Sequence, residues 1–203
     1  MSVRTLGLAA GVAGLIAATL SAAPAAAAVS GSVAVTAASG SGCAPDTVTA
    51  AEKDGKLEIR YRGHQAKAGL NLPKAAVSQC ALSLAITPAA GYGYQLGAGT
   101  QTVDYQVEKG TYSSNTFHYR TDGEAGLLDS DSLDGPHKEV ATTSLAIVEP
   151  VRGCGAAPVK PFLVDNALRH FMGKNTQLVS VSTYSEAPET PSVALGLQWV
   201  TCA

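Results

Sequence analysis

The 203-residue sequence predicts an all-β protein, an antiparallel β-sandwich held by two disulfides. Apolar and polar residues alternate with a period of two through most of the chain, which is the pattern of strands with one buried and one solvated face. Short runs rich in glycine, proline and aspartate separate these stretches and supply turn residues. An even number of cysteines in a chain that begins with an export signal predicts two disulfides.

The first 28 residues have the order of a secretory signal peptide. Arg4 is followed by the uncharged apolar stretch 6–20, and Pro24 and the alanines up to Ala28 form a small-residue cleavage site. The apolar stretch is shorter than the ~20 residues that a membrane span needs, which favours cleavage over an uncleaved anchor. We therefore expect a secreted, extracellular protein without membrane association after cleavage.

Residues 29–203 are expected to form one domain, because this length suits a single core and no internal repeat or second boundary is visible. Removal of Arg4 with the leader leaves 13 basic and 16 acidic residues, a net charge of −3. Nucleic-acid-binding domains are usually strongly basic, so this balance argues against a nucleic acid as partner.

The strands are predicted from the positions of the alternating residues. The clearest alternation covers 57–62, 80–86, 102–107, 116–120 and 193–199. Residues 162–172 fit either an amphipathic helix or a strand, and the pattern alone leaves both open. The most polar stretch, 123–138, is predicted to be a long loop.

Spacing alone allows three pairings of Cys43, Cys80, Cys154 and Cys202. Sequential strands tend to be neighbours in space, which favours Cys43 with Cys80 and Cys154 with Cys202. Cys202 does not share the parity of Trp199, so we expect the last strand to end near Thr201 or the second bridge to lie on its outer face. No C-x-x-C pair occurs, so a redox or zinc-ribbon role has little support.

Seven motifs follow one another in an order that suggests a family: Gly40-Ser41-Gly42-Cys43, Ser78-Gln79-Cys80-Ala81-Leu82, Pro88-Ala89-Ala90-Gly91-Tyr92, Thr116-Phe117-His118-Tyr119, Cys154-Gly155, Asn166-Ala167-Leu168-Arg169 and Leu197-Gln198-Trp199-Val200-Thr201-Cys202. The chain resembles a domain-of-unknown-function family of small secreted four-cysteine proteins found in bacteria and fungi. It departs from that family's pattern at Arg152-Gly153, where an aromatic residue and Ser-Pro are common, and in the acidic stretch 123–138. The resemblance implies a β-sandwich and a strand over 162–172, and it implies no activity.

Motifs for catalysis or metal binding do not stand out. The chain has no G-x-S-x-G elbow, and its four histidines form neither H-x-H nor H-E-x-x-H. Asp129, Asp131 and Asp134 precede Gly135 with a spacing that differs from a calcium loop of the EF-hand type. We expect no metal site and no cofactor, and we favour a protein that is not an enzyme. A glycosidase with two carboxylates stays open, because such acids can come from anywhere in the sequence.

A binding surface is the more plausible source of function. Arg60 and Arg62 share the exposed face of one predicted strand and could hold an anionic polymer, although neighbouring acids also fit a mixed solvated surface. Tyr92 and Tyr94 could form an aromatic platform for sugars or close the end of the core, and His118 is predicted on the solvated face of its strand.

The leading hypothesis is a non-catalytic extracellular or cell-surface binding domain whose partner is a cell-wall or extracellular polymer. The alternatives are a secreted hydrolase with a carboxylate-based site and a secreted inhibitor or effector that acts through the 123–138 loop. An acid beside His118 would favour the hydrolase, and a protruding loop would favour the inhibitor.

Overall fold

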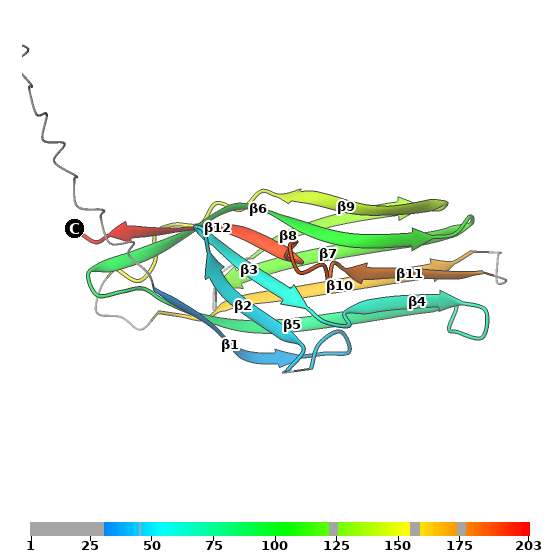
Figure 1. Ribbon diagram of the computed structural model, residues 1–203, viewed down its shortest axis with the longest axis horizontal. Helices are drawn as coiled ribbons and strands as arrows, with labels where there is room; N and C mark the ends of the chain where they lie inside the picture. The colour runs from blue at the N-terminus through cyan, green and yellow to red at the C-terminus, as the bar shows by residue number, and fades with distance from the viewer. Residues whose placement is uncertain (1–30, 45, 122–125, 155–158, 174–177) are drawn as a thin grey trace, which may run out of the picture.

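The computed structural model describes residues 31–44, 46–121, 126–154, 159–173 and 178–203, and it is an elongated β-sandwich (Figure 1). The predicted signal peptide and its cleavage site lie outside these residues. Two antiparallel sheets pack face to face, as the alternation predicted. The described part of the chain has no helix long and apolar enough to cross a membrane.

Sheet A contains five strands in the order β1-β5-β10-β7-β8. Their bounds are Ser32–Ser39 for β1, Ala75–Thr87 for β5, Phe162–Met172 for β10, Thr111–Thr121 for β7 and Leu127–Asp134 for β8. The stretch that the pattern left open, 162–172, is thus the central strand of this sheet, as the family resemblance implied.

Sheet B contains seven strands, with β2-β3-β12-β6-β11-β4 in line and β9 also paired to β6. Their bounds are Val48–Lys53 for β2, Lys56–Tyr61 for β3, Val193–Thr201 for β12, Tyr92–Val107 for β6, Val179–Tyr184 for β11, Gln65–Gly69 for β4 and His137–Leu145 for β9. The long β6 organises the sheet, because β12 and β11 pair with successive parts of it while β9 also pairs with its second half.

The core is apolar where the sheets are broadest. Inward residues of β3, β5, β10 and β12 are almost fully buried, among them Leu57, Ile59, Leu84, Val164 and Leu195. Burying side chains of this size contributes about 1.5–3 kcal/mol each to folding. The period-two stretches therefore form strands because each places one continuous apolar face against the opposite sheet.

The interior becomes small and polar toward the end that holds the β6–β7 turn, here called the distal end. Inward positions there carry Ala66, Ala68, Ser180, Ser182 and Ser113. Because these side chains are short, Cα atoms of β10 come within 8 Å of β4 and β11 in the other sheet, closer than the usual ~10 Å between packed sheets.

Hydrogen bonds between the sheets replace apolar packing at the distal end. The Ser182 hydroxyl lies 2.8 Å from the Ser113 hydroxyl and 2.8 Å from His170 Nε2, and the Thr111 and Ser180 hydroxyls are 3.0 Å apart. Burial lowers the pKa of His170 to about 4, which keeps its imidazole neutral at pH 7.

The predicted loop over 123–138 is wrong for its described residues, 126–138. They form β8, a turn at Gly135-Pro136 and the start of β9. The polar side chains suggested a loop, but β8 lies at the edge of sheet A, where pairing with β7 forms the strand and water solvates its other side. Its Asp131 accepts a hydrogen bond from Thr143 of β9 at 3.1 Å, which joins the two sheets along this edge.

Both disulfides have the predicted pairing. Cys43 is bonded to Cys80 in β5, and Cys154 is bonded to Cys202 just after β12. The last strand ends at Thr201, as the parity of Cys202 predicted. The second bridge marks the end of the molecule opposite the distal end, which we call the proximal end.

Candidate functional site

The outer face of sheet A carries aromatic, charged and polar side chains in register on adjacent strands. On β10 the residues Val164, Asn166, Leu168 and His170 are buried, so the residues between them point outward. Antiparallel pairing then sets β7 and β5 residues beside them on the same face. We call this set the sheet A track: Gln79, Tyr112, Thr116, His118, Asp165, Arg169 and Phe171.

The middle of the track is a hollow of about 390 Å³. Its floor contains the small side chains of Ala81 and Ala167, and the larger side chains of Gln79, Asp165 and Arg169 stand around them. Because small side chains lie between larger ones, this part of the sheet face is a shallow hollow, also called the groove below. Hollows of this kind, with a few convergent polar groups, are where proteins hold ligands.

His118 lies in this hollow and faces an acid. Its Nδ1 is 3.8 Å from Asp165 Oδ2, and both side chains are more than a third exposed. The other side of the imidazole packs against Gly126, just before β8, because a Cβ on that glycine would lie 2.6 Å from Nε2. The ring is therefore held with one nitrogen toward Asp165.

Arg169 and an aromatic pair continue the track toward the distal end. The Arg169 guanidinium donates to the Thr116 hydroxyl at 3.3 Å. The next outward residue of β10, Phe171, pairs with Tyr112, and their ring centroids are 6.0 Å apart. Both rings are exposed, at 42% for Phe171 and 37% for Tyr112.

Sequence reasoning found His118 but not the other charged and aromatic members of the track. Asp165, Arg169 and Phe171 lie on β10, whose pattern was compatible with a helix, so no outward parity was assigned to them. The signal was present: once 162–172 is a strand, its odd-numbered residues share one face.

The two arginines suggested by the sequence lie away from the track. Arg60 is in β3 of sheet B, but Arg62, predicted on the same strand face, lies in the bend that follows, because β3 ends at Tyr61. Arg60 donates to Glu58 at 2.9 Å and to the carbonyl oxygens of Ala187 and Pro188 at 3.2 and 2.8 Å. Its guanidinium thus fixes the β11–β12 connection to β3, and little of it is left for a ligand. Arg62 is exposed, at a hollow of about 260 Å³ beside Arg60.

The two tyrosines suggested as a sugar platform are not placed alike. Tyr94 is only 1% exposed and belongs to the core, while Tyr92 is half-buried near the proximal end. Tyr94 therefore fits the alternative that the sequence left open, in which such a tyrosine closes the sandwich.

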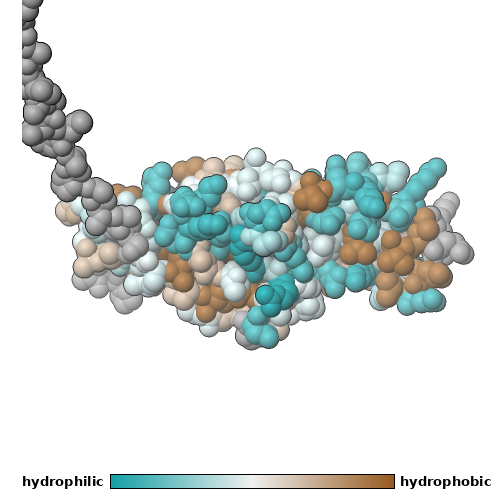
Figure 2. Space-filling view, in the orientation of Figure 1, coloured by the Kyte–Doolittle hydropathy of each residue, from teal (hydrophilic) through white to brown (hydrophobic). Residues whose placement is uncertain are grey.

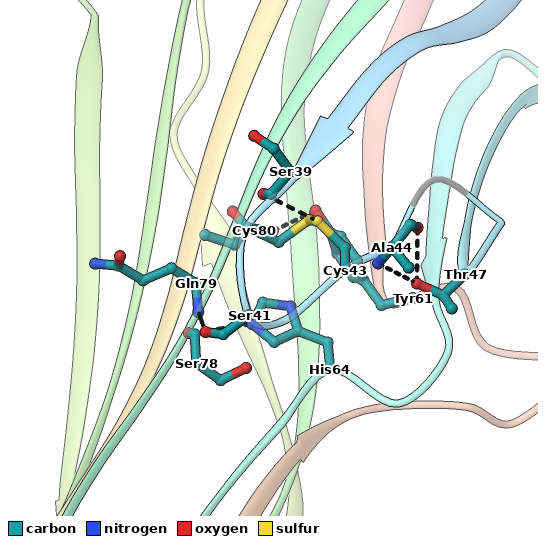
Figure 3. Close-up of a disulfide and its surroundings, with 11 residues drawn as sticks. Ser39, Ser41, Cys43, Ala44, Thr47, Tyr61, His64, Ser78, Gln79 and Cys80 are labelled. Atoms are coloured by element: carbon teal, nitrogen blue, oxygen red, sulfur yellow. Dashed lines mark hydrogen bonds between the residues drawn. A yellow bond between two sulfur atoms is a disulfide. The ribbon is translucent and has the colours of Figure 1, made fainter.

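Figure 3 shows Tyr61 and His64 beside the first disulfide. Together with Tyr184 they form a buried polar cluster, in which the ring centroids lie 4.9–5.2 Å apart. The amide of Asn166 donates to the Tyr61 hydroxyl, and His64 Nε2 lies 3.2 Å from the Ser78 carbonyl oxygen. Burial raises the pKa of both tyrosines and lowers the pKa of His64. These groups are enclosed, so they support the fold rather than meet a ligand.

The comparisons with known proteins now identify the family. The sequence model of a family described as a domain of unknown function, DUF4360, matches residues 30–202. The chain belongs to the DUF4360 family. A search of the curated proteins finds no match.

The structure explains the last glycine of the first motif. Gly42 lies against the His64 imidazole, and a Cβ there would be 2.4 Å from Cδ2 of that ring. A side chain at this position would displace the buried imidazole, so glycine is favoured just before Cys43. Two other motifs of the resemblance, at 116–119 and 166–169, supply Thr116, His118 and Arg169 to the track.

No metal centre is found in the described ranges, where no three His, Cys, Asp or Glu side chains are grouped so that they could hold an ion. Asp131 faces Thr143, and His137 Nδ1 lies 3.5 Å from Glu139 Oε1 at the start of β9. The chemistry that the track offers is thus hydrogen bonding, charge and aromatic contact.

Proposed function

We propose that this DUF4360 domain is a secreted, non-catalytic binding domain that holds an extracellular or cell-surface polymer on the sheet A track. The observation that supports this proposal is the hollow, which charged, amide, hydroxyl and imidazole side chains line, with the exposed Tyr112–Phe171 pair beyond it on the same sheet face. The hollow lies on a solvent-facing side of the sheet and is lined by residues of β1, β5, β10, β7 and β8, so a chain longer than the hollow can extend beyond it.

The disulfides and the order of residues 1–28 support an extracellular setting, since disulfides persist in oxidising compartments. The cell-wall or matrix polymers found there are the partners we propose. Arg62, in the bend after β3, lies away from sheet A, and among the described residues that line the hollow beside it the one aromatic side chain is that of the buried Tyr61.

Binding of the purified domain to isolated cell-wall fractions tests the proposal. We expect retention of the wild type, and at least about a tenfold loss for Arg169→Ala and for His118→Ala, since each removes a charge-assisted or polar contact. Arg62→Ala is the matched control, because it removes an exposed arginine from a bend outside sheet A. Equal retention of all four proteins would contradict the proposal.

A secreted hydrolase is a second candidate, favoured by the pair His118–Asp165. A histidine held by a carboxylate can serve as a general base when a substrate hydroxyl or water lies within reach. Incubation of the domain with wall polysaccharides, followed by assay of new reducing ends, separates the two candidates. Turnover that is lost in Asp165→Asn would establish the hydrolase in place of the binding domain.

A further inference from the structure

We infer that the polymer held by the sheet A track is an uncharged polysaccharide, which lies along β10 with one sugar ring against Tyr112 and Phe171. This inference rests on the binding function proposed above. It adds the chemical class of the ligand, its direction on the sheet and the length that it must have.

The charges of the track indicate an uncharged ligand. Asp165 and Arg169 are four residues apart on one strand, which corresponds to about 13 Å. The Asp165 carboxylate would repel a polyanion on this path, and the Arg169 guanidinium would repel a polycation. Each end of the track also has one further charge. Arg120 lies beyond His118 at one end, and Asp134 lies beside Tyr112 at the other.

The hydroxyl groups of an uncharged polysaccharide can form hydrogen bonds with both the acidic and the basic side chain. Each hydroxyl donates one hydrogen bond and accepts others, so it can donate to the Asp165 carboxylate and accept from the Arg169 guanidinium. Gln79 offers a donor and an acceptor between them. Hydrogen bonds to charged groups are the stronger ones, so these two residues would fix the chain along the groove.

The aromatic pair gives the chain its apolar contact. A sugar ring has polar hydroxyls around its edge and aliphatic C–H groups on its faces, and an aromatic face attracts such C–H groups and removes them from water. Phe171 and Tyr112 present two exposed rings at the distal end of the track. The path thus runs from the aromatic pair past Arg169 to Asp165.

The spacing of these contacts sets a minimum length. From Phe171 to Asp165 is six residues of extended strand, about 20 Å. A single sugar can reach one end only, whereas a chain of several sugars gains both ends in one binding event. Affinity should therefore rise steeply with chain length until the path is spanned and then level off.

Affinity electrophoresis and calorimetry with defined polysaccharides test this inference. The probes are neutral glucans and mannans, with polygalacturonate and dextran sulfate as anionic polymers, and neutral oligosaccharides from the disaccharide to the hexasaccharide. We expect binding to at least one neutral polymer, a change of less than about twofold when salt is raised, and at least a tenfold gain from the disaccharide to the hexasaccharide.

Two pairs of variants assign the binding to the path. Phe171→Ala and Arg169→Ala are each expected to weaken the neutral polymer at least tenfold. The matched controls are Leu178→Ala, which removes a side chain as exposed as Phe171 outside the track, and Arg62→Ala. Circular dichroism and thermal unfolding of each variant show that loss of binding is not loss of fold.

The outcomes separate this inference from the function on which it rests. Binding to anionic polymers alone, lost in the track variants, overturns the neutral polysaccharide and keeps the binding domain. Neutral binding that is unchanged in Phe171→Ala and Arg169→Ala overturns the path and the proposed function together. Binding that a disaccharide satisfies as well as a hexasaccharide overturns the extended placement along β10.

Discussion

At the scale of single residues, two glycines differ in the space that surrounds them. A Cβ on Gly42 would lie 2.4 Å from Cδ2 of His64 and 2.8 Å from the Ser78 hydroxyl, both in buried side chains. A Cβ on Gly97, in the outer face of β6, would meet no atom within 4 Å. The same substitution therefore has different costs at the two positions.

We predict that Gly42→Ala lowers the free energy of unfolding by roughly 1–3 kcal/mol, since the buried imidazole must move to admit the methyl group. Gly97→Ala is expected to change it by less than about 1 kcal/mol, and in the stabilising direction, because the unfolded chain loses freedom while the folded chain loses nothing. Urea unfolding of both variants checks this, and equal effects would contradict the clash.

The buried His170 makes stability depend on pH. Its pKa is lowered to about 4 in the folded protein, against an ordinary value near 6.5 in the unfolded chain. The unfolded state therefore binds a proton first as the pH falls, and the contribution of the neutral imidazole to stability is present above pH 6.5 and is lost by about pH 4. The groups that contact His170, Ser182 and the backbone of Val181, carry no charge.

We predict that the wild type loses roughly 3 kcal/mol more than His170→Gln when urea unfolding is compared at pH 7 and pH 4. The burial that lowers the pKa of His64 adds a loss of the same sign in both proteins. His137→Gln, at an exposed position, is the control and should follow the wild type. A pH dependence that His170→Gln leaves unchanged would contradict this assignment.

At the scale of the strands, the sequence predicted most elements. It missed the strands in which apolar and polar side chains do not alternate. Alternation located β3, β5, β6, β7 and β12, because a buried face leaves a period-two pattern. Trp199 has the inward parity of Val193, Leu195 and Leu197, yet it is only half-buried, beside Gly31 near the end of β12. The alternation along a strand sets whether a side chain points inward. It does not show whether the opposite sheet extends far enough to cover that side chain.

The central strand of sheet A was the hardest to predict, and the candidate site depends on it. Phe162, Val164, Leu168 and Met172 share one parity, yet Leu163, Ala167 and Phe171 on the other parity also complete a helical stripe. The sequence could not show that β10 lies between β5 and β7, and only that placement brings Asp165 to His118. Contacts between distant strands leave no local signal.

The narrow distal interior gives a prediction for β4. Ala68 is fully buried on this strand, and β4 lies close to β10 of the other sheet. Ala68→Leu should lower the free energy of unfolding by about 1–3 kcal/mol or more, because the added side chain forces the sheets apart. Lys67→Leu, one residue earlier on the exposed face, should change it by less than about 0.5 kcal/mol. Thermal unfolding of both variants measures the difference.

At the scale of the whole molecule, the two disulfides close loops of 37 and 48 residues. They differ in how deeply they are buried. In the chain-entropy model each bridge stabilises the fold by roughly 4 kcal/mol, which is large against a typical total of ~5–15 kcal/mol. Cys43 and Cys80 are buried, whereas Cys154 is exposed. The bridges should therefore differ in their access to a reductant.

We predict that a mild reductant opens Cys154–Cys202 first in the folded protein, and that Cys43–Cys80 opens only as the domain unfolds. Alkylation of the freed thiols at successive times, followed by peptide mapping, gives the order. Removal of both bridges should leave a domain that is unfolded or far less stable. Alkylation of Cys80 before Cys154 would contradict the difference in access.

The acidic edge strand β8 has a consequence for the behaviour of the protein at high concentration. An edge of a sheet offers unpaired backbone groups to any other chain, and proteins protect such edges with charges. β8 ends sheet A and carries Asp129, Asp131 and Asp134, so a second copy that approached this edge would bring like charges together. The acidic residues that the sequence suggested as a loop are therefore expected to oppose strand addition, and with it fibril growth, at this edge of sheet A.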